Sequence, residues 1–420
     1  MAPSLFLDNC TLIDATHSRP RPGMAVVITD TRIAEIALAT ELRPAAGQHV
    51  VDLSGAYLLP GLWDCHCHLG VYYPDPNAES LFETPAERTL RALRHATDAL
   101  QAGVTALRAA GEPAYIDVAL RDAFAAGLQV GPRLFVSGPP LKVTGGHGAY
   151  RRRAPVFLDA PTRDAFPSTD PWGGMELDGP DGFRYGARLN IKMGVDWIKL
   201  FVTGGVAGGR ESMTELQMSA AEIEAAVDTA HSKGLKVMAH LGGPDAVRIA
   251  VGAGVDSVEH GYTLDEDAVA LMAEKRVWYV PTLGVTHNEA YMRRMGWAAV
   301  AVEKALAAAP NHQRAFQMAV AAGVRIANGS DLHPLAQTTT AEIEQMVRCG
   351  MTPWDALVAA TRNAAEMCGA LGDLGTIESG KLADLIVVRD NPMDDIRCLK
   401  QMAMVILNGT IVRNGFKEQS

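Results

Sequence analysis

Long apolar runs are absent from this sequence. No stretch reaches the roughly 20 apolar residues that a membrane-spanning helix needs. The first residues, Met1 to Asp8, contain no basic segment followed by an apolar core, so we expect no signal peptide. These absences predict a cytoplasmic protein that has no membrane partner.

Cysteine is scarce, because the 420 residues include only six, scattered along the chain. This spacing is typical of reduced thiols in a long chain and excludes a dense disulfide framework. An excess of basic residues is also missing, since the formal net charge is −10. The acidic balance argues against nucleic acid as the main partner.

What is present is a globular composition, with 48% hydrophobic and 20% charged residues. Both ends of the chain show short strand patterns separated by Asp, Asn, Gly and Pro. Near the C-terminus, Asn408-Gly409 separates two apolar runs, which predicts a hairpin with a type I′ turn. We therefore predict a small β-sandwich domain formed by residues 1–58 and 375–420, and a larger domain over residues 59–374.

The middle of the chain alternates strand and helix patterns. Helix starts are marked by Thr84-Pro85-Ala86-Glu87, by Ser219 with Glu222, and by Thr352-Pro353. The expected strands number eight: Leu62–His68, Val104–Ala109, Arg133–Ser137, Trp197–Thr203, Lys236–His240, Ser257–His260, Trp278–Leu283 and Arg325–Ala327. This pattern predicts an α/β fold, a (β/α)8 TIM barrel.

The alternative fold is a doubly wound open sheet, but no GxGxxG motif follows the first strand. Residues 138–190 do not fit the alternating pattern and are rich in Pro, Gly and Asp. They predict a long insertion that is either a functional lid or a flexible loop.

A His-Cys-His motif lies at the end of the first expected barrel strand. Side chains two residues apart in a strand point the same way, so His66 and His68 project together while Cys65 and Cys67 face the other side. Two neutral imidazoles with a shared direction suit a divalent metal ion. We interpret the two cysteines as buried apolar groups.

Other candidate ligands also fall at the carboxyl ends of expected strands, which meet at one mouth of a barrel. They are Lys199, His240, His260 and Asp331. A buried Lys199 would have a lowered pKa and an amine able to capture carbon dioxide as a bridging carbamate. Taken singly, each has a structural interpretation: a core histidine, a lysine that reaches the surface, or an aspartate that caps a helix.

The chain resembles the amidohydrolase superfamily. The matching segments are Leu59 to His68, Lys199, Ala239-His240, Val258 to Gly261, Gly329-Ser330-Asp331 and Gly380 to Leu385. The resemblance implies two divalent metal ions, with one held by His66, His68 and Asp331. It implies that His240 and His260 hold the other and that carbamylated Lys199 bridges them. Zinc is expected from these ligands, and cobalt, manganese or iron also fit.

The segment Val143 to Gly148 and the long loop after it resemble the imidazolonepropionase-like and Xaa-Pro dipeptidase-like branch. Overall the chain is most similar to the bacterial ochratoxin A-hydrolysing amidohydrolases of that branch. The resemblance implies hydrolysis of the amide bond of N-acyl amino acids, with ochratoxin A giving ochratoxin alpha and phenylalanine. The alternatives are an Xaa-Pro or Xaa-Arg dipeptidase and a cyclic-amide hydrolase.

For this chemistry we expect a small-molecule amide or dipeptide-like substrate, and a homo-oligomeric enzyme. Asp331 would take a proton from the attacking water and pass it to the leaving amine. His147 would donate a hydrogen bond to the oxyanion or to a substrate carboxylate. The expected substrate-binding residues are His147, Tyr150, His287 and His333. Deamination and a non-catalytic scaffold remain the other classes considered.

Overall fold

The computed structural model describes residues 4–70, 83–148, 174–206 and 211–416. Tyr150 and much of the predicted insertion lie outside these residues. Within the described ranges, no helix combines the length and the apolar composition that a membrane span requires.

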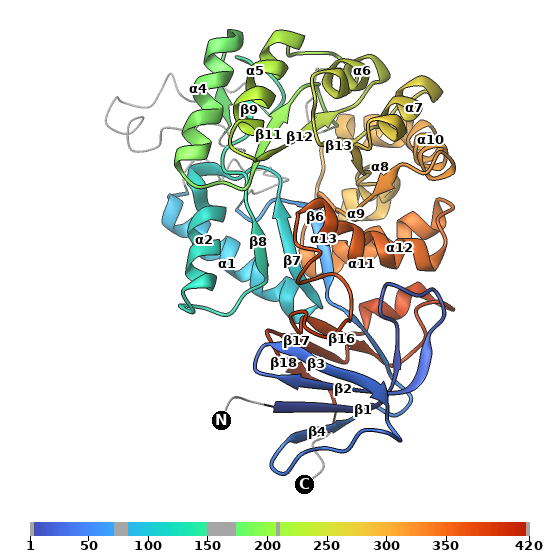
Figure 1. The fold of residues 1–420 in the computed structure, drawn as a ribbon. Coiled ribbons are helices and arrows are strands. Elements are labelled where there is room, and N and C mark those ends of the chain that lie inside the picture. The colour runs from blue at the N-terminus through green and yellow to red at the C-terminus, as the bar shows by residue number, and fades with distance from the viewer. Residues whose placement is uncertain (1–3, 71–82, 149–173, 207–210, 417–420) are drawn as a thin grey trace.

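Strands from both ends of the chain form one eight-stranded sheet, seen in blue and red at the bottom of Figure 1. The N-terminal strands are β1 (Ser4–Leu12), β2 (Arg21–Thr29), β3 (Arg32–Leu38), β4 (His49–Asp52) and β5 (Tyr57–Pro60). The C-terminal strands are β16 (Leu385–Val388), β17 (Met404–Leu407) and β18 (Thr410–Asn414). The antiparallel pair of β5 and β16 joins the two halves.

The remaining strands are parallel to their neighbours. One sheet contains β6 (Leu62–Cys67), β7 (Val104–Ala109) and β8 (Arg133–Phe135). The other has the order β10 (Met175–Glu176), β9 (Leu141–Lys142), β11 (Trp197–Phe201), β12 (Lys236–Leu241), β13 (Ser257–His260), β14 (Trp278–Val280) and β15 (Arg325–Ile326). All eight predicted strands are present, and β9 and β10 are additional.

Backbone hydrogen bonds connect the two parallel sheets on both sides. On one side, the Cys65 N–H donates to the Asn328 carbonyl at 2.8 Å, and the Asp331 N–H donates to the His66 carbonyl at 2.8 Å. On the other, the Trp197 N–H donates to the Val136 carbonyl at 3.1 Å. The arrangement is consistent with a TIM-barrel-like domain.

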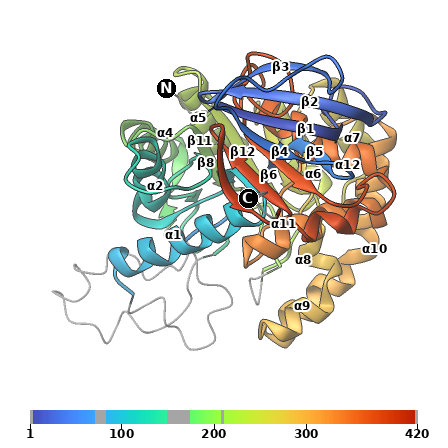
Figure 2. The same ribbon diagram turned by 90° about the horizontal axis from the view of Figure 1, so that it is seen from below.

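Helices surround these strands. Figure 2 shows β6, β8, β11 and β12 in the middle, with α1, α2 and α4 on one side and α10, α11 and α12 on the other. The helices are α1 (Pro85–Gln101), α2 (Ile116–Ala125), α4 (Gly179–Lys192), α5 (Ala220–His231), α6 (Pro244–Gly252), α7 (Glu266–Glu274), α8 (Gly284–His287), α9 (Glu289–Arg294), α10 (Ala299–Ala321), α11 (Leu335–Arg348), α12 (Pro353–Ala359) and α13 (Arg362–Met367). Short 3₁₀ helices are η2 (Pro113–Tyr115) and η4 (Ile396–Lys400).

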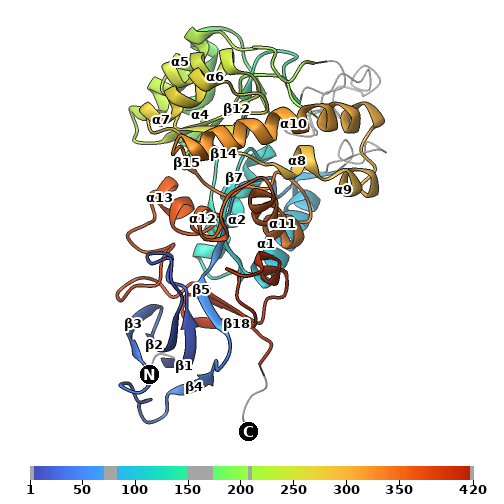
Figure 3. The same ribbon diagram turned by 90° about the vertical axis from the view of Figure 1, so that its right-hand side faces the viewer.

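The predicted helix starts are correct where a capping motif marks them. Thr84 and Ser219 each form a full capping box with Glu87 and Glu222, and Thr352 caps α12. Figure 3 shows α10 crossing the upper half of the molecule beside α8 and α9.

The segment 138–190 is not wholly irregular, and in this respect the sequence interpretation was wrong. It contains β9, β10 and most of the 14-residue helix α4. Gly179-Pro180 opens α4, and the regularly spaced Phe183, Ala187 and Asn190 are buried along one face. The helix was not predicted because this segment also contains glycines and a proline, which argue against a helix.

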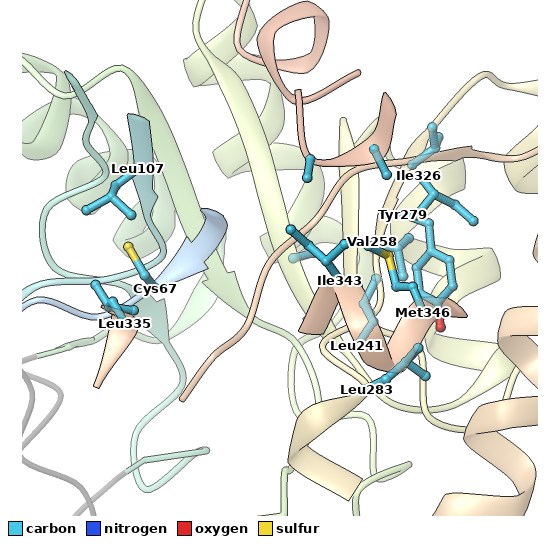
Figure 4. Close-up of a cluster of buried hydrophobic side chains, with 14 of the residues drawn as sticks. Cys67, Leu107, Leu241, Val258, Tyr279, Leu283, Ile326, Leu335, Ile343 and Met346 are labelled. Carbon is cyan, nitrogen blue, oxygen red and sulfur yellow. The ribbon is translucent and has the colours of Figure 1, made fainter. Parts of the chain in front are cut away.

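The core lies between the parallel strands and the helices. In Figure 4, Cys67 and Leu107 lie close to Leu335 of α11, while Ile343 and Met346 of the same helix lie near Tyr279 and Val258. Cys67 belongs to this core, and Cys65 lies in a second apolar cluster with Trp63 and Trp197. All six cysteines are free.

The hairpin between β17 and β18 gives a test of the fold. Asn408 and Gly409 both have positive φ, 49° and 71°, as a type I′ turn requires. A Cβ on Gly409 would lie 2.2 Å from the Asp30 carbonyl oxygen. We expect Gly409→Ala to destabilise the protein by at least about 1 kcal/mol, because a side chain is strained at positive φ and would also clash.

Thermal denaturation of purified protein measures this effect. Gly372→Ala is the matched control, since that exposed glycine has open space around it. Equal unfolding midpoints for the two variants would contradict the role given to the turn.

Candidate metal centre

Three predicted ligands meet at the end of β6. His66, His68 and Asp331 offer ligand atoms that all lie within 4.8 Å of one another. Asp331 Oδ1 is 3.2 Å from His68 Nε2 and 3.7 Å from His66 Nε2. Two imidazoles and a carboxylate are suitable ligands for a divalent ion.

Hydrogen bonds set the orientation of both histidine rings. His66 Nδ1 lies 2.7 Å from Glu259 Oε2, and His68 Nδ1 lies 2.9 Å from the Gly111 carbonyl oxygen. Both contacts engage Nδ1, so Nε2 of each ring points toward Asp331. Outer hydrogen bonds of this kind fix the tautomer of metal-binding histidines.

His240 and His260 lie beside this cluster. Their ring centroids are 4.3 Å apart, and the His260 ring lies 4.7 Å from the His66 ring. His240 Nε2 contacts the Gly204 carbonyl oxygen at 3.0 Å, so Nδ1 is the ring nitrogen that this contact does not occupy. The sequence predicted that these two histidines lie on neighbouring strands. This is correct, since β12 and β13 are paired in parallel.

The backbone at two of these residues is strained. His260 has φ 72° and Asp331 has φ 53°, a region that residues other than glycine rarely adopt. The His260 carbonyl accepts hydrogen bonds from the Tyr279 hydroxyl at 2.8 Å and from His312 Nε2 at 2.9 Å. Such strain, held by buried partners, is characteristic of functional sites.

Lys199 lies on β11, lines the same cavity as these residues and is fully buried. Its Nζ has no hydrogen-bond partner among the described residues. Burial lowers the pKa of this amine to about 8. A buried amine without a hydrogen-bond partner, next to five candidate metal ligands, is chemically compatible with a divalent metal site.

The carboxylate that contacts His66 Nδ1 belongs to a buried ion pair. Arg108 Nη2 lies 2.8 Å from both carboxylate oxygens of Glu259, and neither side chain is exposed. Burial alone would raise the pKa of Glu259, but Arg108 and His66 hold it well below its ordinary value. No role was assigned to Arg108 or Glu259 from the sequence. A charged residue inside an apolar strand is nevertheless a signal that the residue has a role, because charged groups are rarely buried unless they are paired.

His147 lies at the same site, on the loop after β9. Its ring stacks on His240 with centroids 4.4 Å apart, and its Nδ1 is 2.7 Å from Glu211 Oε1. His147 and the other candidate residues line one cavity. The described residues that line the cavity are His66, His68, His147, Lys199, Phe201, Val206, His240, His260, Tyr262, Val285, Trp297 and Asp331.

Two predicted substrate-binding residues do not line that cavity. His287 Nδ1 contacts the Leu283 carbonyl oxygen at 3.0 Å, within its own helix α8. The His333 ring packs 5.0 Å from the His95 ring. Tyr150 lies outside the described residues.

The family of this chain follows from its similarity to known proteins. Residues 57–412 match the model of the amidohydrolase family. This chain belongs to the amidohydrolase family. Members of this family generally use divalent metals, which agrees with the cluster of His66, His68 and Asp331.

The relatives agree with the predicted branch. The chain is 33% identical to ochratoxinase of Aspergillus niger over 400 residues, covering 91% of this chain and 80% of that protein. The crystal structure of A. niger ochratoxinase matches with a TM-score of 0.84 and 30% identity over 99% of this chain and 96% of the other. A Xaa-Pro dipeptidase with bound methionine matches with a TM-score of 0.87 and 30% identity, over 98% and 100%.

An imidazolonepropionase of Methylobacterium nodulans is 25% identical over 394 residues, 89% of this chain and 90% of that enzyme. The predicted superfamily and branch are therefore confirmed. The protein is a hydrolase that acts on carbon–nitrogen bonds.

The Arg108–Glu259 pair provides a stability prediction. We expect Glu259→Gln to cost about 3–5 kcal/mol, because Arg108 would be left buried without its counter-charge. Thermal denaturation of protein treated with a chelator measures this without any contribution from metal binding. Glu274→Gln is the control, since its side chain is 68% exposed and pairs with the exposed Lys275. Similar losses in both variants would contradict the role of the buried pair.

Proposed function

We propose that this protein is a binuclear-metal amidohydrolase that cleaves the amide bond of N-acyl amino acids, with ochratoxin A as a substrate and ochratoxin alpha and phenylalanine as products. The observation that carries the proposal is the unpartnered amine of buried Lys199 beside four histidines and Asp331. The 33% identity to a protein named ochratoxinase supports the substrate.

The proposed ligands are the two groups of histidines, together with Asp331 and Lys199. His66, His68 and Asp331 would hold one ion, His240 and His260 would hold the other, and a carbamylated Lys199 would supply an anionic ligand to both. We propose zinc, because imidazole and carboxylate ligands suit it. Divalent ions at such a site lower the pKa of water and polarise a carbonyl group.

Asp331 is proposed to move the proton. Burial acts to raise the pKa of its carboxyl, but His66 and His68 hold the pKa below its ordinary value. Asp331 is therefore a carboxylate that can accept a proton from the attacking water and deliver it to the amine nitrogen as the carbon–nitrogen bond breaks. Its side chain is 17% exposed, so it can be reached from the cavity.

The cavity wall favours an aromatic or apolar substrate. Phe201, Val206, Tyr262, Val285 and Trp297 line it around the polar centre. Apolar and aromatic side chains beside convergent polar groups are typical of a site for a small organic molecule. Ochratoxin A, which has an aromatic group on each side of its amide bond, suits this wall.

The second candidate is an Xaa-Pro or Xaa-Arg dipeptidase. A Xaa-Pro dipeptidase matches this chain over nearly its full length with a TM-score of 0.87. A cyclic-amide substrate is a third, since an imidazolonepropionase is also a relative. All three reactions would use the same proposed metal centre.

We also propose that residues 59–374 form a closed (β/α)8 barrel and that residues 1–58 and 375–420 form a β-sandwich domain. The hydrogen bonds on both sides of the parallel sheets and the shared terminal sheet support this division. A homo-oligomeric state and a cytoplasmic location remain predictions.

Lys199→Ala tests the bridging role. We expect bound metal and activity to be lost together, because the variant lacks the anionic bridge between the two histidine clusters. Elemental analysis of the purified protein gives the metal content. Lys275→Ala, at an exposed lysine, is the control. Full metal content and full rate in Lys199→Ala would show that the lysine is not a ligand.

Asp331→Asn tests the substrate and the proton transfer together. Released amine is measured for ochratoxin A, an N-acyl phenylalanine, Xaa-Pro and Xaa-Arg dipeptides and a cyclic imide. We expect phenylalanine from ochratoxin A, at least about a hundredfold less with Asp331→Asn, because no carboxylate then accepts the proton. A chelator should abolish the activity. Turnover of the cyclic imide alone would discard the proposed substrate and retain the site.

A further inference from the structure

Helix α10 contacts the backbone beside both histidines of the pair His240 and His260. The helix crosses the upper half of the molecule beside α8 and α9 (Figure 3). Two of its side chains, Lys304 and His312, bind backbone carbonyl oxygens of other segments. Neither side chain is among the described residues that line the cavity, so any effect on the candidate metal centre must pass through the residues that they hold.

His312 binds the carbonyl oxygen of His260. The distance from Nε2 is 2.9 Å, and a carbonyl oxygen can only accept, so Nε2 carries the ring hydrogen. The other nitrogen, Nδ1, lies 2.8 Å from the Thr286 hydroxyl on α8 and can accept from it. The side chains of His312 and Thr286 are both fully buried. A neutral imidazole therefore makes both contacts, and no charge on His312 is required.

The carbonyl that His312 binds belongs to a strained turn. His260 has φ 72° and the next residue, Gly261, has φ 58°. The Tyr279 hydroxyl is a second donor to the His260 carbonyl, at 2.8 Å, so two buried groups oppose relaxation of this backbone. The His260 ring is held separately, because its Nδ1 lies 2.7 Å from the Thr282 hydroxyl. Its Nε2 is the ring nitrogen that this contact does not occupy.

The same helix also holds the segment beside His240. Lys304 Nζ donates to the Glu211 carbonyl at 2.8 Å and to the Gly205 carbonyl at 3.2 Å. The adjacent carbonyl, that of Gly204, contacts His240 Nε2 at 3.0 Å. One helix thus fixes the backbone next to both histidines of this pair.

We propose that His312 is a positioning residue that, together with Tyr279, holds His260 in the strained conformation that directs its imidazole to one of the two proposed metal ions. This inference rests on the proposed binuclear centre. The rings of His66 and His68 are oriented by partners outside α10, so the effect should be confined to one ion. Hydrogen bonds behind a metal ligand are known to set metal affinity.

Two amide substitutions separate the contacts of His312. The amide nitrogen in His312→Gln can take the place of Nε2, whereas that in His312→Asn takes the place of Nδ1 and cannot reach His260. Metal-free protein is titrated calorimetrically with zinc in a bicarbonate buffer. We expect His312→Asn to bind one of the two ions at least about tenfold more weakly and the other unchanged. His312→Gln should bind both ions nearly as tightly as the unmodified protein.

Gln317→Ala is the matched control. Gln317 also donates from α10 to a backbone carbonyl, that of Cys349 at 3.0 Å, and neither residue lines the cavity. This variant should bind both ions as the unmodified protein does. Unchanged affinities in His312→Asn, or equal weakening of both ions, would overturn the inference.

Tyr279→Phe provides a second variant if His312→Asn does not fold. It removes the other donor to the His260 carbonyl and retains the aromatic ring. Binding of the same single ion should weaken, because only one hydrogen bond then opposes relaxation of the turn. Affinities equal to those of the unmodified protein would overturn the inference.

A crystal structure of metal-free His312→Asn separates this inference from the proposed function. We expect the peptide between His260 and Gly261 to leave its present orientation and the His260 ring to move. If the unmodified protein binds no second ion, the binuclear centre fails, and the structure alone decides whether His312 positions His260. An unchanged φ at His260, with the ring in the same place, would overturn the inference.

Discussion

The contact between Glu259 and Arg108 supports much of the centre of this protein. Both groups are charged and fully buried, so each requires the other. Arg108 also donates from Nε to the Cys65 carbonyl at 2.6 Å, and Glu259 contacts His66. The pair thus connects β6, β7 and β13 at the level of the candidate ligands. Burying the two charges costs desolvation free energy. In return, Glu259 holds one histidine in a single orientation.

Buried carboxylates perform a second, repeated task at the ends of the strands. Glu112 accepts from the backbone N–H groups of Leu69 and Gly70, after β6. Glu342 accepts from Leu283 and Gly284, after β14. Burial raises the pKa of both carboxyls to about 8. Each carboxyl group supplies acceptor oxygens, in place of water, to the first backbone N–H groups beyond the end of a strand.

Local signals allowed much of this structure to be predicted. Strands, capped helix starts, the Asn408-Gly409 turn and the His66–His68 pair all depend on neighbours in sequence, and parallel strands bring their ends together. The missing parts depend on distant residues. His147 and Glu211 are 64 positions apart, and Arg108 and Glu259 are 151 apart. No spacing rule relates such residues, and only the folded chain shows that they meet.

The junction between β5 and β6 has a consequence for how the chain is made. Only Gly61 separates the two strands, so the first candidate ligands follow directly from the terminal sheet. That sheet needs β16, which pairs with β5 but is synthesised more than three hundred residues later. Pairing over such a distance is slow, because the entropy of a long loop is lost before the contacts form. On the ribosome, one edge of β5 can therefore pair with β1 early, whereas its other edge is covered by β16 only when nearly the whole chain has been made.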